Sequence, residues 1–350
     1  MVVLLVGMCP GLDEDLLRSL RAADIRTVED LVSSDIEDLA QKCSVSYKAL
    51  FAIRRVLLAQ HTAFPVSGAD LYEELLSSTA ILSTGNPSLD KLLDSGLYTG
   101  EITELTGGPG SGKSQVCFGV AVHIAYHLKQ SVIYIDTTGG LTASRLLQML
   151  QSETNNTDEQ MEALQRIHTF RLFDVGALLD CLYGLGGGGL HKACVGGGSV
   201  KALIVDSVSA VIAPLLGGKQ NEGMSLMIQV AAALKTMAKD FSVAVLVTNH
   251  VTRSGSGEAR PGLGVSWSHI PRTRILLERV ESGASGRRSA TLIKSSRQAC
   301  LIKEDFDLQW WSRAEGEKGG AERGEKGGGA ERGEKGGEPS GKRKLDETDT

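Results

Sequence analysis

The octapeptide GGPGSGKS, at residues 107–114, constrains this chain more than any other stretch. It fits the phosphate-loop pattern in full and lies between a predicted strand, EITELT at 101–106, and a predicted helix at 114–129. In such a loop, glycines let backbone N–H groups curve around phosphates, and the helix start adds the positive end of its dipole. A glycine turn with an incidental lysine is the alternative, which the strand–loop–helix context disfavours. The sequence therefore predicts a site for nucleotide phosphates.

The residue types around this loop predict that ATP and Mg²⁺ are bound. Lys113 can reach the outer phosphates, and the Ser114 hydroxyl is a typical Mg²⁺ ligand. The buried strand LIVDS places Asp206 at its end, where a carboxylate can hold the water shell of the metal. The predicted metal ligands are thus Ser114 and Asp206. The predicted ATP-binding loop comprises Gly107, Gly108, Pro109, Gly110, Ser111, Gly112, Lys113 and Ser114.

Continuously apolar runs alternate with helical segments downstream of residue 80, and this pattern is typical of an α/β protein. Runs of this kind suit a mostly parallel, twisted sheet that is buried on both faces. TRILLERV and ATLIKS, which are separated by SGASGRR, predict a hairpin at the edge of that sheet. The other predicted strands lie at 131–136, 167–173, 200–206 and 243–249.

The first 60 residues carry apolar side chains at helical spacing and predict a small all-α domain. Its expected helix N-caps are Asp13, Thr27, Asp35 and Ser46. The segment PGLDEDLLRSLRAADIRTVEDLV resembles a helix-hairpin-helix unit, whose glycine turn can hold a phosphate. Docking of a protein and simple packing are the alternatives in this acidic segment.

Composition shifts divide the rest of the chain. Residues 61–79 carry Pro65 and Gly68 and suit a linker, and 80–312 form the predicted ATP-binding domain. A glycine-rich stretch at 184–198 predicts a flexible surface insertion. The repeated charged tail, 313–350, predicts disorder. Its KRK triplet at 342–344 is either part of a nuclear import signal or an ordinary solvated tail segment.

Composition also excludes several classes of protein. With 41% hydrophobic residues and a net charge of −5, the chain is globular and is not coated with basic residues for wrapping duplex DNA. Its six cysteines include no Cys-x-x-Cys pair, which argues against a disulfide framework or a zinc site and favours cytosol or nucleus. No stretch reaches the ~18 apolar residues of a membrane span, and MVVLLVG is too short for a signal peptide.

The order of GGPGSGKS, LIVDS and VLVTNHV after a small helical domain and a linker resembles the RecA-type recombinase family. Within that family, FPVSGADLYEEL, SWSHIPRTRILL and KSSRQ resemble the D-type paralogues of the eukaryotic recombinase, which act in DNA repair. The resemblance implies a RecA-like P-loop ATPase core with ATP at a subunit interface. It also implies that loops at 213–224 and 252–267 face single-stranded DNA.

Those loops supply the predicted DNA contacts, Lys219, Arg253 and Arg260. Trp267 is their one obvious aromatic for base stacking, and ordinary mobile surface loops are the alternative. Arg145 matches the family arginine that stacks on adenine, although a solvated arginine is the alternative without the family.

Three further positions bear on hydrolysis. Asn249 and His250 occupy the γ-phosphate sensor position, where the family generally carries Asn-Gln, so the histidine departs from the pattern. In YIDTTGGL, Thr138 stands where active members carry the glutamate that polarises the attacking water. A threonine cannot take that proton at neutral pH, and a lost general base typically forfeits ~10²- to 10⁴-fold in rate. Asp136 is the nearest other carboxylate, and we interpret it as structural.

The resemblance implies a weak, DNA-stimulated ATPase that works in homologous recombination repair of double-strand breaks and damaged forks. It would act in the nucleus as a subunit of a heteromeric paralogue complex that binds single-stranded DNA and assists the main recombinase. One neighbour is expected on the N-terminal domain and linker, and another on the ATPase domain. The alternatives are a fully active DNA-dependent ATPase motor and a scaffold without direct DNA binding or exchangeable nucleotide.

Overall fold

The structure is a computed structural model, and it describes residues 2–61, 67–190, 199–216, 222–253, 259–280 and 286–313. Within these ranges, no helix combines the length and apolar character needed to cross a membrane. The charged tail, its KRK triplet and residues 191–198 of the glycine-rich stretch lie outside the described residues.

The N-terminal segment is helical, as its apolar spacing predicts. Asp13, Thr27 and Asp35 cap their helices by accepting hydrogen bonds from backbone N–H groups two or three residues ahead. Ser46 Oγ likewise accepts from the N–H of Ala49 at 3.2 Å. Buried leucines and isoleucines on the inner faces form one apolar core. The helices are α1 (Glu14–Ala22), α2 (Val28–Ser33), α3 (Ile36–Lys42) and α4 (Tyr47–His61).

The stretch expected to be a linker contains a helix, α5 (Gly68–Ser78), which Ser67 caps by accepting from the N–H of Asp70 at 3.1 Å. None of its residues is buried. Its large apolar side chains stand in solvent at 49–66% exposure: Leu71, Tyr72, Leu75 and Leu76. The segment is therefore an ordered helix with an apolar face that the described part of the chain does not cover.

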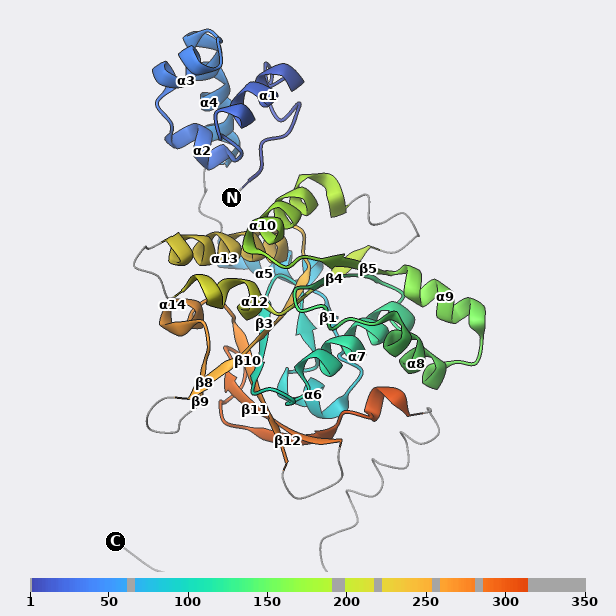
Figure 1. The fold of residues 1–350 in the computed structure, drawn as a ribbon. Coiled ribbons are helices and arrows are strands. Elements are labelled where there is room, and N and C mark those ends of the chain that lie inside the picture. The colour runs from blue at the N-terminus through green and yellow to red at the C-terminus, as the bar shows by residue number, and fades with distance from the viewer. Residues whose placement is uncertain are drawn as a thin grey trace, which may run out of the picture. The chain divides into compact units, whose positions relative to one another are not determined.

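An eight-stranded sheet in the order β12-β11-β10-β3-β7-β6-β4-β5 forms the centre of the larger part of the chain (Figure 1). From β10 to β5 all neighbours are parallel, and β11 and β12 continue the sheet antiparallel to β10. The α/β fold with a mostly parallel sheet is confirmed. The strands are β3 (Ile102–Gly107), β4 (Ser131–Asp136), β5 (Ile167–Arg171), β6 (Val200–Asp206), β7 (Ala244–Asn249), β10 (Thr273–Arg279), β11 (Arg287–Lys294) and β12 (Lys303–Asp307).

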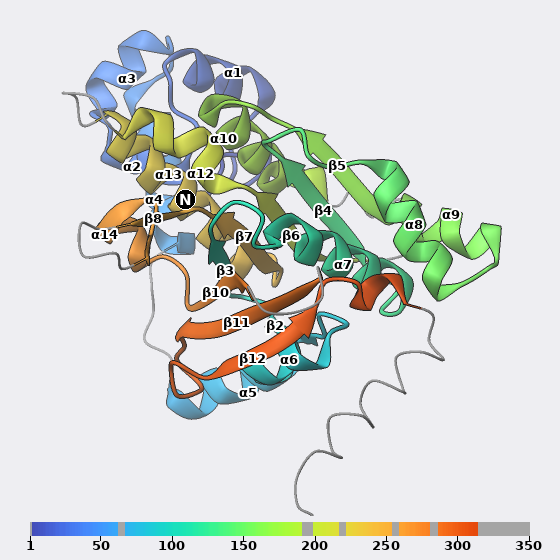
Figure 2. The same cartoon turned by 60° about the horizontal axis from the view of Figure 1, so that its bottom comes forward.

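Strand β12 was missed by the sequence reasoning. The predicted hairpin corresponds to β10 and β11, but it does not end the sheet, because β12 pairs with the outer side of β11 (Figure 2). Four of the five β12 residues are charged, a composition that protects an edge strand from pairing with other chains. A short separate pair, β1 (Ile81–Leu82) with β2 (Leu97–Tyr98), precedes the sheet.

Helices cover both faces of the sheet, because successive side chains of a buried strand point to opposite sides. In β4, Val132 and Tyr134 belong to the core on one face, and Ile133 and Ile135 to the core on the other. The first core includes α6 (Pro87–Leu92), α7 (Lys113–Tyr126), α8 (Ala143–Glu153) and α9 (Thr157–Gln165). The second includes α10 (Val175–Gly184), α12 (Val208–Ile212), α13 (Glu222–Asp240) and α14 (Gly264–Ser268).

The start of the glycine-rich insertion is helical rather than irregular. A π-helical turn, Leu185–Gly189, continues α10, and Leu185 and Leu190 are buried in the second core. These two leucines anchor the backbone although glycines surround them. The described part of the predicted insertion is thus helical, and its flexibility stays a prediction.

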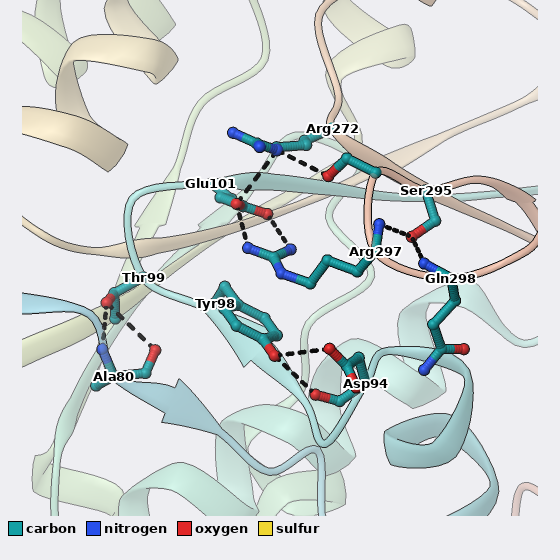
Figure 3. A network of polar contacts seen from close by, with 10 residues as sticks. Ala80, Asp94, Tyr98, Thr99, Glu101, Arg272, Ser295, Arg297 and Gln298 are labelled. Carbon is teal, nitrogen blue, oxygen red and sulfur yellow. Dashed lines mark hydrogen bonds and ion pairs between the residues drawn. The ribbon is translucent and has the colours of Figure 1, made fainter. Parts of the chain in front are cut away.

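The KSSRQ stretch, which begins on the last residue of β11, is fixed to the segment directly before β3 by a polar network (Figure 3). The Arg297 guanidinium makes two hydrogen bonds to the Glu101 carboxylate and lies 3.5 Å above the centre of the Tyr98 ring. Arg272 Nε lies 3.4 Å from Glu101 Oε1 and donates to Ser296 Oγ at 2.9 Å. Hydrogen bonding to Glu101 raises the pKa of Arg297, so the network keeps its charge. The KSSRQ stretch thus has a structural role, because it holds the end of β11 against the segment before β3.

Candidate nucleotide-binding site

The phosphate loop connects the end of β3 to the start of α7. Gly110 and Gly112 have φ angles of 73° and 101°, in the left-handed region that favours glycine. At Gly107 an added Cβ would lie 2.4 Å from the carbonyl oxygen of Leu277, so no larger residue fits. The backbone path therefore favours glycine at positions 110 and 112, and the contact with Leu277 requires it at position 107.

The loop and the residues beneath it fit a phosphate group. An added Cβ at Gly108 or Gly110 would meet nothing within 4 Å in the described part of the chain, so the loop is open there. Ser111 Oγ is buried and has no hydrogen-bond partner among the described residues. The Lys113 ammonium donates to the carbonyl oxygens of Gly107 at 2.7 Å and Gly108 at 3.0 Å. A phosphate would give the Ser111 hydroxyl the hydrogen-bond partner that it lacks. It would also give the Lys113 ammonium an acceptor in place of the two backbone carbonyl oxygens.

Asp206 stands beside Lys113, at the end of β6. Burial lowers the pKa of the Lys113 ammonium below its ordinary value, and the Asp206 carboxylate opposes that shift. Two hydroxyl groups from neighbouring strands orient this carboxylate: Thr248 Oγ1 donates at 2.5 Å and the Tyr134 hydroxyl at 3.0 Å. The sequence reasoning missed both partners, although a hydroxyl in a buried strand has to find an acceptor.

The turn after β4 is built around Asp136. Its Oδ1 accepts from the backbone N–H groups of Thr138, Gly139 and Gly140 at 3.0, 2.8 and 3.3 Å, and its Oδ2 from that of Leu141 at 3.0 Å. Burial alone would raise the pKa of Asp136, but these four donors outweigh it and the pKa is lowered. Asp136 is therefore a structural carboxylate that stays ionised. Thr138 is exposed in the turn, with its hydroxyl 3.3 Å from Asp136 Oδ1.

The end of β7 joins a buried polar cluster. Asn249 Nδ2 and the Trp267 indole N–H both donate to Glu104 Oε1, each at 2.8 Å. The other oxygen of Glu104 pairs with Arg274 Nε, and both side chains are almost completely buried. Asn249 Oδ1 is buried without a hydrogen-bond partner in the described ranges. Trp267 was expected to stack on DNA bases; it is instead fully buried and ties α14 to β3.

His250 follows directly at the strand end. Desolvation, and after it the charge of Lys113, lower the pKa of its ring below the ordinary value of 6.5, while Asp206 opposes them. The imidazole is therefore neutral at physiological pH. Its backbone oxygen accepts from the N–H of Gly262 at 2.8 Å, which joins the strand end to the segment before α14.

Arg145 lies on α8 and reaches the first turn of α7. Its Nε donates to Gln115 Oε1 at 2.9 Å and its Nη1 to Gln148 Oε1 at 2.7 Å. The predicted adenine-binding side chain is thus held next to the phosphate loop by two glutamines.

The structure describes the side chain of none of the three predicted DNA contacts. Lys219 lies outside the described residues. Arg253 and Arg260 lie on two short paired strands, β8 (Val251–Arg253) and β9 (Ala259–Pro261), and their side chains are not among those described. The DNA contacts therefore stay predictions.

Fold and site together define a P-loop protein with a RecA-like core. The chain belongs to the Rad51 family: residues 76–295 match the family model of Rad51, and residues 1–60 match that of the N-terminal domain of RAD51D. The family resemblance inferred from the motifs is confirmed. The division of the chain into domains stays a prediction.

Curated relatives support this membership. The chain is 56% identical to "DNA repair protein RAD51 homolog 4" of Bos taurus over 311 residues, covering 88% of this chain and 95% of the relative. The protein of that name from Mus musculus is 55% identical over 312 residues, with the same coverage. "DNA repair and recombination protein RadA" of Aeropyrum pernix is 26% identical over 289 residues, covering 77% of this chain and 85% of the relative.

Proposed function

We propose that this chain is an ATP-binding subunit of a heteromeric complex of Rad51 paralogues that works in homologous recombination repair in the nucleus. The names of its relatives support a role in DNA repair. The observation that carries the proposal is the pairing of a complete phosphate loop with a turn in which Thr138 replaces the expected base. ATP then serves mainly to hold subunits together, because a ligand bound in the assembled state stabilises that state.

The residues of the site have separate roles. The loop from Gly107 to Gly112 would present backbone N–H groups to phosphates, and Lys113, which donates to two backbone carbonyl oxygens here, would donate to phosphate oxygens instead. Ser114 and Asp206 would hold Mg²⁺, and the hydroxyl groups of Thr248 and Tyr134 orient the Asp206 carboxylate for that task. When bound, ATP supplies the phosphoanhydride that hydrolysis would cleave.

Hydrolysis by this chain alone is slow. The Thr138 hydroxyl can position a water but cannot accept its proton at neutral pH. Asp136 cannot replace the missing base, because four N–H donors engage its oxygens and lower its pKa. The expected loss is on the order of 10²- to 10⁴-fold relative to a site with a positioned base. Weak, DNA-stimulated ATPase activity remains.

The uncovered apolar face of α5 supports docking of one neighbouring subunit on the linker. Side chains such as Leu75 and Leu76, at 50% and 66% exposure, suit burial against a partner. The second neighbour contacts the ATPase domain. Single-stranded DNA binds at the loops that carry Lys219, Arg253 and Arg260 through salt-sensitive phosphate contacts.

Two measurements on the full chain test this proposal. Lys113→Ala and Asp206→Ala should abolish ATP-dependent co-purification with the paralogue partners, while Lys235→Ala, an exposed lysine on α13, should leave it intact. Steady-state phosphate release by the lone chain should be slow with and without single-stranded DNA. Brisk release that depends on Lys113 would instead identify a motor. If both variants co-purify with the paralogue partners as the wild type does, the chain is a scaffold whose assembly does not depend on ATP.

A further inference from the structure

Thr137, the first residue after β4, bonds the end of β6 with both its backbone and its side chain. Its backbone N–H donates to the carbonyl oxygen of Asp206 at 3.0 Å. Its hydroxyl donates to the carbonyl oxygen of Ser207 at 2.7 Å and accepts from the backbone N–H of Ser207 at 2.7 Å. The side chain thus bonds both polar backbone groups of the residue that follows the predicted metal ligand.

These contacts are shielded from water. Thr137 and Asp206 are each 5% exposed, and Ser207 is 2% exposed. A buried backbone group that loses its hydrogen-bond partner destabilises the arrangement around it. The position of the backbone after Asp206 therefore depends on the Thr137 hydroxyl.

Ser207 is also held from the opposite direction along the chain, by α12. As the N-cap of that helix, its Oγ accepts from the N–H of Ala210 at 3.2 Å, and Ser209 Oγ donates to it at 3.3 Å. Residues of α12 such as Val208 and Ile212 are buried in the second core, so the helix itself is fixed. The backbone at Ser207 is therefore held between α12 and the turn after β4.

Asp206 is thus supported by two sets of contacts. Thr248 and Tyr134 bond its carboxylate oxygens. Thr137 bonds the backbone from which that side chain extends. A carboxylate at the end of a strand moves with its own backbone, so both sets determine where its oxygens lie. Contacts of this indirect kind set how well a carboxylate binds a metal ion.

We propose that Thr137 is a positioning residue for Mg²⁺, which acts by holding the backbone of Asp206 and Ser207 through its hydroxyl and its N–H. This inference rests on the proposed binding of ATP together with Mg²⁺. It gives the two neighbouring threonines of the turn different roles. Thr138 stands where the base is expected, and Thr137 holds the strand end that carries the metal ligand. The turn therefore serves the metal site although it lacks the base.

The test measures ATP binding to the full chain by titration calorimetry, once with excess Mg²⁺ and once with EDTA. Thr137→Val keeps the size of the side chain and removes its hydroxyl. It should lower the affinity in Mg²⁺ on the order of tenfold, as expected when an outer-shell partner of a metal ligand is lost, and leave the affinity in EDTA unchanged. Thr137→Ser, which keeps the hydroxyl, should bind ATP as the wild type does in both buffers. Thr137→Ala, which removes the hydroxyl without placing a methyl group against the Ser207 peptide, should show the same loss as Thr137→Val and replaces it if that variant does not fold.

Thr84→Val is the matched control. The buried Thr84 hydroxyl bonds Asn86 in the same way, because it donates to the carbonyl oxygen and accepts from the N–H of that residue, each at 3.2 Å. Thr84 lies before α6, outside the proposed metal site. This variant should lower the melting temperature, as Thr137→Val does, but bind ATP as the wild type does in both buffers.

The outcomes separate the inference from the function beneath it. If Thr137→Val binds ATP in Mg²⁺ as the wild type does, or loses equal affinity in both buffers, the role of Thr137 is overturned and the proposed ATP binding stands. A loss of the same size in Thr84→Val overturns it as well, because the effect then follows from stability. A wild-type affinity that is the same in Mg²⁺ and in EDTA overturns the metal site. A wild-type chain that binds ATP in neither buffer overturns the proposed ATP binding itself.

Discussion

The buried carboxylate of Glu104 allows a stability prediction with a magnitude. Glu104→Gln keeps the size of the side chain, and its carbonyl oxygen can still accept from Asn249 and Trp267. Its amide nitrogen, however, would face Arg274, a donor against a donor, and leave that cation buried without a counter-charge. Breaking a buried ion pair in this way costs about 3–5 kcal/mol. At roughly 2–4 °C per kcal/mol for a domain of this size, the melting temperature should fall by about 6–20 °C.

Thermal unfolding followed by circular dichroism measures this loss, and two further variants control it. Glu162→Gln removes the partner of Arg166 in a pair with an exposed carboxylate and should cost less than about 1 kcal/mol. Adding Arg274→Met to Glu104→Gln removes the orphaned cation and should restore much of the stability. If Glu104→Gln lowers the melting temperature no more than Glu162→Gln does, the buried pair does not stabilise the sheet and the reasoning is wrong.

Three other outcomes are expected. Thr138→Glu should raise steady-state phosphate release by up to ~10²- to 10⁴-fold if only the base is missing; no gain on the purified chain would point to His250 or to the geometry between subunits. The pKa of His250 is lowered in the folded chain, so the unfolded chain takes up the proton first as the pH falls through 6.5, and wild-type stability drops. His250→Gln should therefore lose less stability than wild type between about pH 7.5 and 5.5 in urea titrations, and equal losses would refute the assignment. Leu75→Ser with Leu76→Ser should leave the melting temperature unchanged but weaken co-purification with a paralogue partner; an unaltered yield of complex would show that α5 is not the docking face.

The sequence predicts the centre of the sheet well. The apolar runs at 131–136 and 200–206 coincide with β4 and β6 residue for residue. These strands are buried on both faces, so apolar character alone defines their ends. The phosphate loop is equally clear, because its backbone path favours or requires glycine at fixed positions.

Elements at the surface are less readable. Pro65 and Gly68 favoured a linker, yet Ser67 and Asp70 form a capping pair at the start of α5, which is the signal that would have indicated a helix. Strand β12 was missed because Phe306 is its one buried apolar residue and its other four residues are charged, so the sequence shows no alternation of apolar and polar residues.

Trp267 shows a different limit. In the sequence it stands in a glycine-rich segment that resembles a DNA loop, but its indole bonds to Glu104, 163 residues away. No local pattern reports such a partner. The available signal was Glu104 itself, since a glutamate within an apolar strand requires buried donors to neutralise it.

In the turn after β4, the residues that determine the backbone shape differ from the residue at the expected position of the catalytic base. Its form comes from the side chain of Asp136 and from Gly139, whose φ is 75°, while the exposed residue at 138 contributes one weak hydroxyl contact. The side chain at 138 therefore does not determine the shape of the turn, and a glutamate or a threonine fits the same backbone. A change of the residue at 138 therefore alters the chemistry available in this turn and leaves the phosphate loop, which lies on another segment, as it is.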